Sequence, residues 1–409
     1  MARIKTYPTL LIIIFTLVFL SIRPLMAQDR NRISGTVLSA EGAMPVDGVT
    51  IAWLNKGIGS ITNSEGHFII VLTASYAGTD SLTFSCIGYS TEKFSIGTAI
   101  GTNGLVVKLK PLVENLKEVV VRPLSLKQLL DSITQHNNEA FASPIKMNGY
   151  YRELVFTNDK CTEFSDAICA YFFDRVTQPD GQLKIIASRC RKETKENKDK
   201  DNMEVYKDSK INPNQAFSYA MLTGMIEKYF PEKSLADYQY TMQQQGSEQD
   251  LKIVILPKTD TGEAFYQLTL MLKGDFTLKS YRLEIPERLL GQVKEKSLLG
   301  IHIKVVKNLI EVNYLSIAGH IYPGYYSVRK LTKLWGKFLG TTINQLKEEK
   351  SEFVTGNVVL NSSAFTKADV YKKGNLCSNG TAINDDLLKN YTIIKPTMKD
   401  SVAISALGN

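Results

Sequence analysis

The feature that most constrains the fold of this chain is the alternation of short apolar runs with turn-forming residues over residues 32–110. Turn signals that recur about every 8–12 residues are typical of a small all-β sandwich. Ile33, Gly35 and Val37 would share one face of a first strand, because successive side chains of a strand point to opposite faces. The segment therefore predicts an N-terminal β-sandwich.

Glycines and one short polar segment mark the expected turns of this sandwich. Gly57 and Gly59 interrupt the alternation, as bulges or close backbone approaches would. Residues 63–66 (Asn-Ser-Glu-Gly) predict a tight turn, since Asn and Gly tolerate a positive φ. The strand after it, residues 67–72, is apolar on both faces and is expected to be buried on both sides.

Four sequence elements of this region resemble a known family: residues 33–37 (ISGTV), 45–50, 62–68 and 86–89. They are similar to the carboxypeptidase regulatory-like domain, a transthyretin-like β-sandwich of Bacteroidetes surface and periplasmic proteins. Asn63 stands where the family commonly has Asp, and either side chain can cap the turn. The resemblance implies a binding or accessory module that supplies no catalytic groups.

The first residues have the pattern of a secretory signal. Arg3 and Lys5 precede an apolar run over residues 10–20, and Ala27 offers a small residue for cleavage. The run is short for a membrane-spanning helix, so an uncleaved anchor is the alternative. We expect residues 1–27 to be a signal peptide, and the protein to be exported to the periplasm or to be associated with the outer membrane.

The rest of the chain predicts a second, larger β-rich unit. Ser125 is expected to cap a helix that runs to about Asn137, and a second helix is expected over residues 213–230. Expected strands follow over residues 150–156, 161–173, 183–191, 238–242, 251–256, 265–272, 279–285, 301–306, 311–317, 325–331 and 352–360. They would form one antiparallel sheet that is strongly curved or closes as a half-barrel.

The predicted fold class is therefore mainly β. A sandwich over residues 28–112 is followed by a linker and helix over residues 113–143. Residues 144–409 form an α+β domain with a curved antiparallel sheet and about two helices.

Charge argues against a nucleic-acid partner. The formal net charge is +8, and removal of residues 1–27 takes away three basic residues and no acidic one, which leaves +5. Residues 189–210 mix eight basic with six acidic side chains, the composition of a solvated loop. This mild excess of positive charge is not accompanied by a cluster of basic residues or by a known nucleic-acid-binding motif.

Five cysteines leave the disulfide pairing open: Cys86, Cys161, Cys169, Cys190 and Cys377. An exported protein can form disulfides. Cys161 and Cys169 would lie about 26 Å apart on one continuous strand, too far to pair. A disulfide from either of them to Cys190 across a hairpin remains a candidate.

The sequence assigns no catalytic, cofactor-binding or metal-binding residue. Metal and nucleophile motifs such as HExxH, CxxC and GxSxG are missing, and the histidines (His67, His136, His302 and His320) show no paired metal-ligand spacing. His67, His302 and His320 fit structural roles. Arg152 and Glu153 would point to opposite faces of one strand and cannot form a dyad. These observations favour a non-enzymatic protein.

One cluster is a candidate ligand site. On an alternating strand, Arg329, Lys333, Trp335 and Lys337 would share one face. Such a face could bind an anionic lipid head group or a glycan, with Trp335 as a stacking platform. The alternative is an exposed strand face with one packed tryptophan.

The leading functional hypothesis is a non-enzymatic exported accessory or binding protein, whose partner would be a protein or glycan of the cell envelope. The alternatives are a carbohydrate-binding module, a lipid or lipoprotein carrier, and an enzyme whose site assembles from distant residues. A peripheral association with the membrane is compatible with the first of these.

Overall fold

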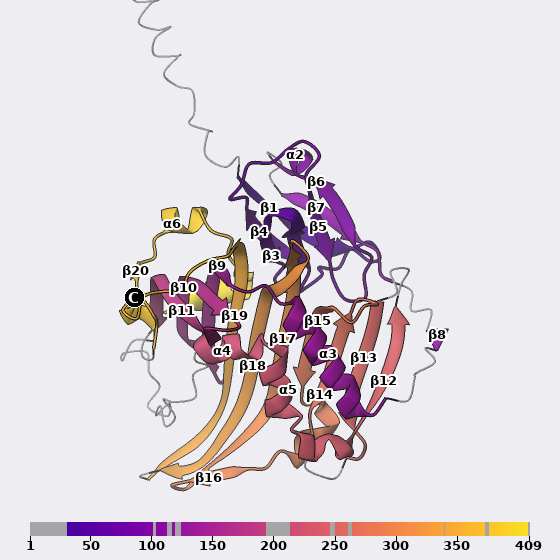
Figure 1. Ribbon diagram of the computed structural model, residues 1–409. Helices are drawn as coiled ribbons and strands as arrows, with labels where there is room; N and C mark the ends of the chain where they lie inside the picture. The colour runs from indigo at the N-terminus through magenta and orange to yellow at the C-terminus, as the bar shows by residue number, and fades with distance from the viewer. Residues whose placement is uncertain are drawn as a thin grey trace, which may run out of the picture.

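A computed structural model describes residues 31–100, 104–112, 117–118, 124–193, 213–245, 250–260, 264–338, 340–372 and 376–407. The predicted signal peptide, residues 1–27, and most of the charged segment 189–210 lie outside these residues. Figure 1 shows a small β-sandwich above one end of a large curved sheet, and helices α3, α4 and α5 against one face of that sheet. We call this the inner face of the sheet and the opposite one the outer face.

The sandwich consists of two small sheets. One has the order β4 (His67–Val71), β1 (Arg32–Ser39), β7 (Leu105–Leu109), and the other the order β3 (Ile58–Ile61), β2 (Thr50–Trp53), β5 (Ser81–Ser85), β6 (Glu92–Ser95). Their facing side chains form one buried core, which includes Val37, Trp53, Phe68, Phe84 and Val107. The expected N-terminal β-sandwich is confirmed.

The turn predictions in the sandwich also hold. Gly66 has a φ of 72°, and the Asn63 Oδ1 accepts hydrogen bonds from the backbone N–H groups of Glu65 (3.0 Å) and His67 (2.9 Å). A Cβ added at Gly57 would overlap Val358, and one at Gly59 would overlap Leu315. Both glycines therefore allow the sandwich to approach the large sheet closely.

The large sheet is open and almost entirely antiparallel. Its main strands run, edge to edge, in the order β11 (Gln178–Lys192), β10 (Lys160–Asp174), β9 (Ile145–Thr157), β19 (Thr341–Leu360), β18 (His320–Phe338), β17 (Ile301–Ile317), β15 (Leu278–Glu284), β14 (Gln267–Leu272), β13 (Asp250–Pro257) and β12 (Tyr238–Gln245). The short strands β8 (Lys117–Glu118), β16 (Lys296–Leu298) and β20 (Thr381–Ala382) pair with β12, β17 and β11. In the part of the chain that is described, β11 and β12 do not pair, so the curved sheet does not close.

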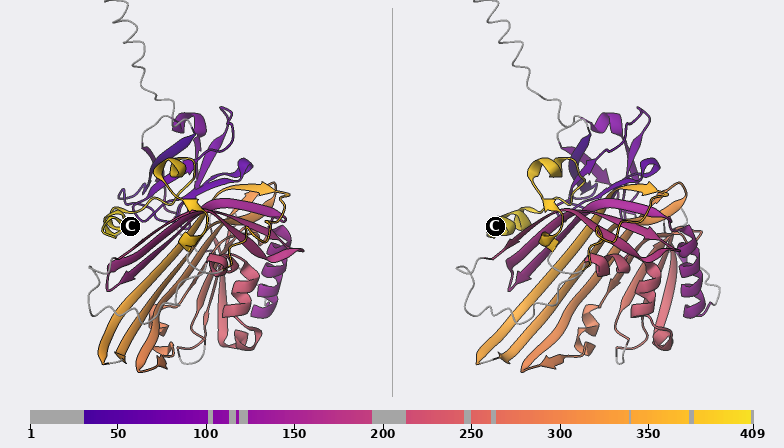
Figure 2. Two further views of the ribbon diagram at one scale, coloured as in Figure 1. Left: turned by 90° about the vertical axis from the view of Figure 1, so that its left-hand side faces the viewer. Right: turned by 60° about the vertical axis from the view of Figure 1, so that its left-hand side comes forward.

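The central strands are longer than the sequence pattern indicated. The two strands expected over residues 301–306 and 311–317 are one strand, β17, which absorbs an extra residue as a bulge between Val305 and Lys307. The expected strands at 325–331 and 352–360 are parts of β18 and β19. As a result β17, β18 and β19 extend beyond the helices as a long ribbon, which Figure 2 shows at the lower end of the molecule.

Helices cover the upper part of the inner face. α3 (Leu126–Ala140) is capped by Ser125, as predicted, in a capping box with Gln128. The helix buries Leu129, Leu130 and Ile133. The helix expected over residues 213–230 is divided into α4 (Pro213–Tyr219) and α5 (Leu222–Tyr229). The Tyr314 hydroxyl of β17 donates to the Ala220 carbonyl (2.5 Å) at the break, so this carbonyl is satisfied outside a continuous helix.

Side chains of the inner face pack directly on these helices. The Tyr171 ring stacks on Phe217 of α4 with 3.9 Å between ring centroids, and it meets Phe353 edge-on. The same core contains Tyr151, Tyr326 and the buried leucines of α3.

The C-terminal segment, residues 376–407, lies on the outer face, between the large sheet and the sandwich. α7 (Met398–Ser405) packs Ile404 on Leu154 and Phe164 of β9 and β10. The Thr392 hydroxyl accepts a hydrogen bond from the Val71 N–H (3.0 Å), and the Asn63 amide donates to the Lys395 carbonyl (2.9 Å). The segment therefore joins the sandwich to the large sheet, a role that the sequence pattern did not indicate.

One disulfide ties the start of this segment to the sheet edge. Cys190 of β11 is bonded to Cys377, with 5.9 Å between their Cα atoms, while Cys86, Cys161 and Cys169 are free. The candidate pairings of Cys161 or Cys169 with Cys190 are therefore wrong. Cys190 does lie beside the hairpin of β10, but its partner comes from a segment far along the chain.

Candidate functional site

A row of charged side chains crosses the outer face of the sheet. Each residue stands directly opposite the next in the strand pairing, so the row, which includes one serine, is continuous across seven neighbouring strands. We call it the charge row; its members in spatial order are Arg282, Glu311, Ser327, Glu352, Arg152, Asp166 and Arg189.

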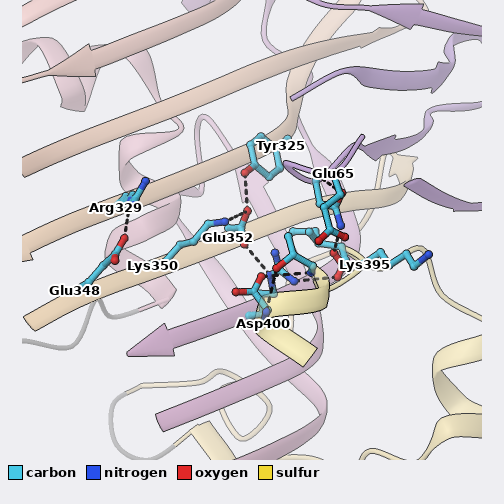
Figure 3. A network of polar contacts seen from close by, with 12 residues as sticks. Glu65, Tyr325, Arg329, Glu348, Lys350, Glu352, Lys395 and Asp400 are labelled. Carbon is cyan, nitrogen blue, oxygen red and sulfur yellow. Dashed lines mark hydrogen bonds and ion pairs between the residues drawn. The ribbon is translucent and has the colours of Figure 1, made fainter. Parts of the chain in front are cut away.

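The middle of the charge row is buried. Arg152 is 1% exposed, and its Nε donates to the Glu352 Oε2 at 2.7 Å. Its Nη1 donates to the Ile394 carbonyl of the C-terminal segment at 3.2 Å, so the guanidinium is covered by backbone as well as paired. Figure 3 shows Glu352 between Lys350 and Tyr325, with Asp400 of α7 nearby. An enclosed pair of this kind has a structural role, since no ligand could reach it without moving the C-terminal segment.

The pairs at the ends of the charge row are more exposed. Asp166 is fully buried, but its partner Arg189 is partly exposed and donates to it from Nε (3.1 Å) and Nη2 (2.6 Å). The Tyr150 hydroxyl also donates to Asp166. At the other end Arg282 pairs with Glu311 (2.6 Å) and Glu284 (2.9 Å). The exposure of the arginines therefore rises from Arg152, which the C-terminal segment covers, toward Arg189 and Arg282 at the two ends.

Acidification should destabilise the protein through Glu352. Burial opposes its ionisation, but Arg152, Lys350 and the Tyr325 hydroxyl outweigh this and hold its pKa at about 2, below the ordinary 4.5. Because the unfolded chain binds this proton more tightly, the stabilisation is present above the unfolded pKa and is lost as the pH falls from 4.5 through about 2. We expect Glu352 to account for about 2 kcal/mol of lost unfolding free energy between about pH 7 and pH 3.

Urea titrations at the two pH values measure this loss. The matched control is the double variant Arg152→Met/Glu352→Gln, which lacks both the titrating carboxyl and the charge that perturbs its pKa. Its stability should fall less steeply with pH than that of the wild type. Equal slopes for the two proteins would contradict the role of Glu352.

The four residues predicted as a ligand site lie on one face of β18. From Tyr325 to Phe338 this strand pairs with β19 without a bulge, so Arg329, Lys333, Trp335 and Lys337 all face outward on the outer face. Lys333 and Lys337 are exposed, and Trp335 is half-buried. Arg329 differs from the others, because it forms an ion pair with Glu348 of β19 and is largely neutralised (Figure 3).

The structure adds a lysine to this group. Lys304 of β17 stands directly opposite Lys333, and His302 stands opposite Trp335. Like charges directly opposite each other on neighbouring strands repel and destabilise the pair. Among the described residues no carboxylate forms an ion pair with Lys304, Lys333 or Lys337. We call Lys304, Lys333, Trp335 and Lys337 the basic patch.

The indole of Trp335 is fixed within the basic patch. Its ring stacks on the His302 imidazole with 5.4 Å between centroids and an angle of 14° between planes, and the Lys333 Nζ lies 5.6 Å from the ring centre. His302 in turn contacts Ser297 (3.0 Å) and Glu295. Lys304 and His302 were missed by sequence reasoning, because only the register between β17 and β18 brings them to this face. Trp53, the other tryptophan, is 2% exposed in the sandwich core.

The other polar residues considered from the sequence lie away from the basic patch and do not form a common site. Arg152 and Glu153 do point to opposite faces: Glu153 accepts a hydrogen bond from the Tyr151 hydroxyl (2.5 Å) on the inner face. His67 lies beside Glu65, and His136 contacts Thr277 of the large domain. Over the described ranges, no three His, Cys, Asp or Glu side chains gather to hold a metal ion. No helix in those ranges is both long and apolar enough to cross a membrane.

Comparison with solved structures yields only weak similarity. A structure described as "lipid-protein interactions in lipovitellin" is 7% identical, with a TM-score of 0.28; the match covers 58% of this chain and 27% of that chain. A DUF1329 family protein from Desulfovibrio piger is 7% identical, with a TM-score of 0.23; the match covers 59% of this chain and 95% of that chain. At these TM-scores neither structure bears on the fold or the function.

Comparison with protein families identifies the N-terminal part. No curated protein matches the chain. Residues 33–121 match the model of the CarboxypepD_reg-like domain. Apart from Arg32 at the start of β1, this range contains the sandwich strands β1 to β7 and the Asn63–Gly66 turn. Residues 33–121 are therefore a carboxypeptidase regulatory-like domain.

Proposed function

We propose that this protein is an exported, non-enzymatic accessory protein of the periplasm or outer membrane, and that it acts by binding an anionic ligand on the basic patch. The observation that carries the proposal is the juxtaposition of Lys304 and Lys333 with no carboxylate partner. A bound anion would relieve their repulsion, so the patch gains more from an anion than a solvated surface with balanced charge does.

An anionic ligand is favoured over a neutral glycan at this surface. A sugar-binding platform needs the free face of an aromatic ring. The Trp335 ring already stacks on His302 and interacts with Lys333. Three lysines therefore dominate the chemistry of the surface, and the indole packs against His302 and Lys333.

Two further observations support export. The basic residues and apolar run at the start of the chain have the pattern of a secretory signal. The Cys190–Cys377 disulfide is a bond that persists mainly in oxidising compartments. The carboxypeptidase regulatory-like domain supports an accessory role, because this module accompanies functional domains without supplying catalytic groups.

Calorimetric titration with inorganic polyphosphate tests the proposal. We expect the wild-type chain without residues 1–27 to bind, with an affinity that falls as salt rises, because the contacts are exposed and screened. The variant Lys304→Glu/Lys333→Glu should bind at least about tenfold more weakly, since two attractive charges become repulsive.

The matched control carries the same change of charge elsewhere. Lys93 and Lys108 are exposed on the sandwich, so Lys93→Glu/Lys108→Glu alters the net charge equally and leaves the basic patch intact. This variant should bind polyphosphate nearly as well as the wild type. An equal loss in both double variants, or no loss in either, would show that the basic patch is not the binding site.

A further inference from the structure

Two exposed leucines form the tip of the ribbon next to the basic patch. Leu298 of β16 pairs with Ile301 of β17, so Leu299 and Gly300 form the two-residue turn between them. Leu298 is 58% exposed and Leu299 is 74% exposed. Figure 1 shows β16 at the lower end of the molecule, far from the sandwich.

The turn uses leucine where the backbone disfavours it. Leu299 has a φ of 50° and Gly300 a φ of 82°, the left-handed conformations of a type I′ turn. Asn, Asp or Gly normally occupies the first of these positions, because a larger side chain there is strained. Leu299 thus combines a strained backbone conformation with an exposed apolar side chain. Such a combination is expected where the side chain has a binding role.

The strand behind the turn holds it rigidly. The Lys337 N–H of β18 donates to the Gly300 carbonyl at 3.1 Å. A Cβ added at Gly336 would overlap this same carbonyl oxygen, so only glycine permits the close approach. The two leucines are therefore presented in a fixed orientation, which lowers the entropy lost on binding.

Basic residues flank the leucines on the two faces of the ribbon. Lys296 of β16 and Lys337 of β18 are exposed beside the turn, and Lys333 lies further along the same strand. The acidic residue nearest in sequence, Glu295, is engaged by His302. The neighbouring turn, between β18 and β19, repeats the Leu-Gly sequence at residues 339–340, of which Gly340 has a φ of 83° and Leu339 lies outside the described residues.

We propose that this tip, Leu298 and Leu299, inserts into the surface of an anionic lipid bilayer while the basic patch binds the head groups. An apolar end flanked by lysines, with Trp335 two residues before Lys337 on the same strand face, matches the layered chemistry of a membrane interface. The inference rests on the proposed function, because the basic patch supplies the electrostatic attraction. It names the anionic ligand as a lipid head group held in a bilayer.

Vesicle sedimentation tests the insertion with the full chain lacking residues 1–27. We expect binding to vesicles of phosphatidylcholine with phosphatidylglycerol, and much weaker binding to phosphatidylcholine alone. The variant Leu298→Thr/Leu299→Asn should bind the anionic vesicles at least about tenfold more weakly, because two apolar side chains no longer leave water. Asn suits the left-handed turn, so this variant should fold at least as well as the wild type.

Polyphosphate binding separates the two proposals. The leucine variant should bind polyphosphate like the wild type, because the basic patch is unchanged. Val176→Ser, at an exposed turn between β10 and β11 at the opposite end of the sheet, is the control for loss of an exposed apolar residue and should not alter vesicle binding.

Three results would overturn the membrane proposal. If the wild type binds polyphosphate but not anionic vesicles, the basic patch is still an anion-binding site, but a bilayer is not its ligand. A wild type that binds neither would contradict both proposals. A leucine variant that binds anionic vesicles as tightly as the wild type would show that the attraction is purely electrostatic and that the tip does not insert.

Discussion

Replacing Arg152 by methionine should lower the free energy of unfolding by about 3–5 kcal/mol. The methionine keeps the aliphatic bulk but removes the charge, and Glu352, which is 4% exposed, then remains buried without its guanidinium partner. Asp166 also loses the cation opposite it in the strand pairing, although Arg189 and Tyr150 still contact it. The Ile394 carbonyl loses its donor as well, so the C-terminal segment should loosen from the sheet. Urea denaturation measures the change.

The matched control for Arg152 is Arg282 in the same charge row. Arg282→Met removes contacts with Glu284 and Glu311, but these side chains are 29% to 41% exposed, and water can replace the guanidinium. The expected cost is therefore about 1 kcal/mol or less. In the double variant Arg152→Met/Glu352→Leu much of the lost stability should return, because Lys350, the ion-pair partner left over, is partly exposed to water. Similar costs for Arg152→Met and Arg282→Met would refute the argument from burial.

Removing the disulfide should have an effect of similar size. Cys190 and Cys377 are 187 residues apart in sequence, and closing so long a loop restricts the unfolded chain strongly. The chain-entropy relation gives about 5 kcal/mol for a loop of this length. Cys190→Ala/Cys377→Ala should show this loss in urea denaturation under oxidising conditions. Cys86→Ala, at a free and half-buried thiol, is the control and should cost about 1 kcal/mol or less.

A reducing agent supplies an independent test of the same bond. It should destabilise the wild type and leave the Cys190→Ala/Cys377→Ala variant unchanged. Alkylation of protein recovered from its native compartment, denatured without reductant, should label Cys86, Cys161 and Cys169 alone. Labelling of all five cysteines would show that the bond is absent in the cell, and would remove one of the two supports for export.

Local features of this protein were predictable because neighbouring residues determine them. The Asn63–Gly66 turn needs one polar side chain that accepts backbone N–H groups and one glycine with a positive φ. The start of α3 needs only the Ser125–Gln128 pair and the apolar spacing that follows. The shared face of Arg329, Lys333, Trp335 and Lys337 follows from the two-residue period of a strand. In each case the deciding contacts span only a few residues.

Other features required the tertiary structure. The alternation of the strand placed Arg152 and Glu153 on opposite faces, but no residue near Arg152 in the sequence indicates that Glu352 is its partner. The Lys304–Lys333 pair depends on the register of β17, which a bulge shifts between Val305 and Lys307. The division between α4 and α5 depends on a hydroxyl of β17, and the partner of Cys190 is Cys377.

The sequence by itself thus determined the β-sandwich, the turns, the position of α3 and the faces of the strands. Only the tertiary structure decided which strands pair, which charges the C-terminal segment buries, and that the basic patch lies beside the Leu298–Leu299 turn. The physical reason is the range of the interactions. Turns, caps and side-chain alternation are governed by contacts between near neighbours, whereas strand register and burial arise from contacts between segments that meet only when the whole chain has folded.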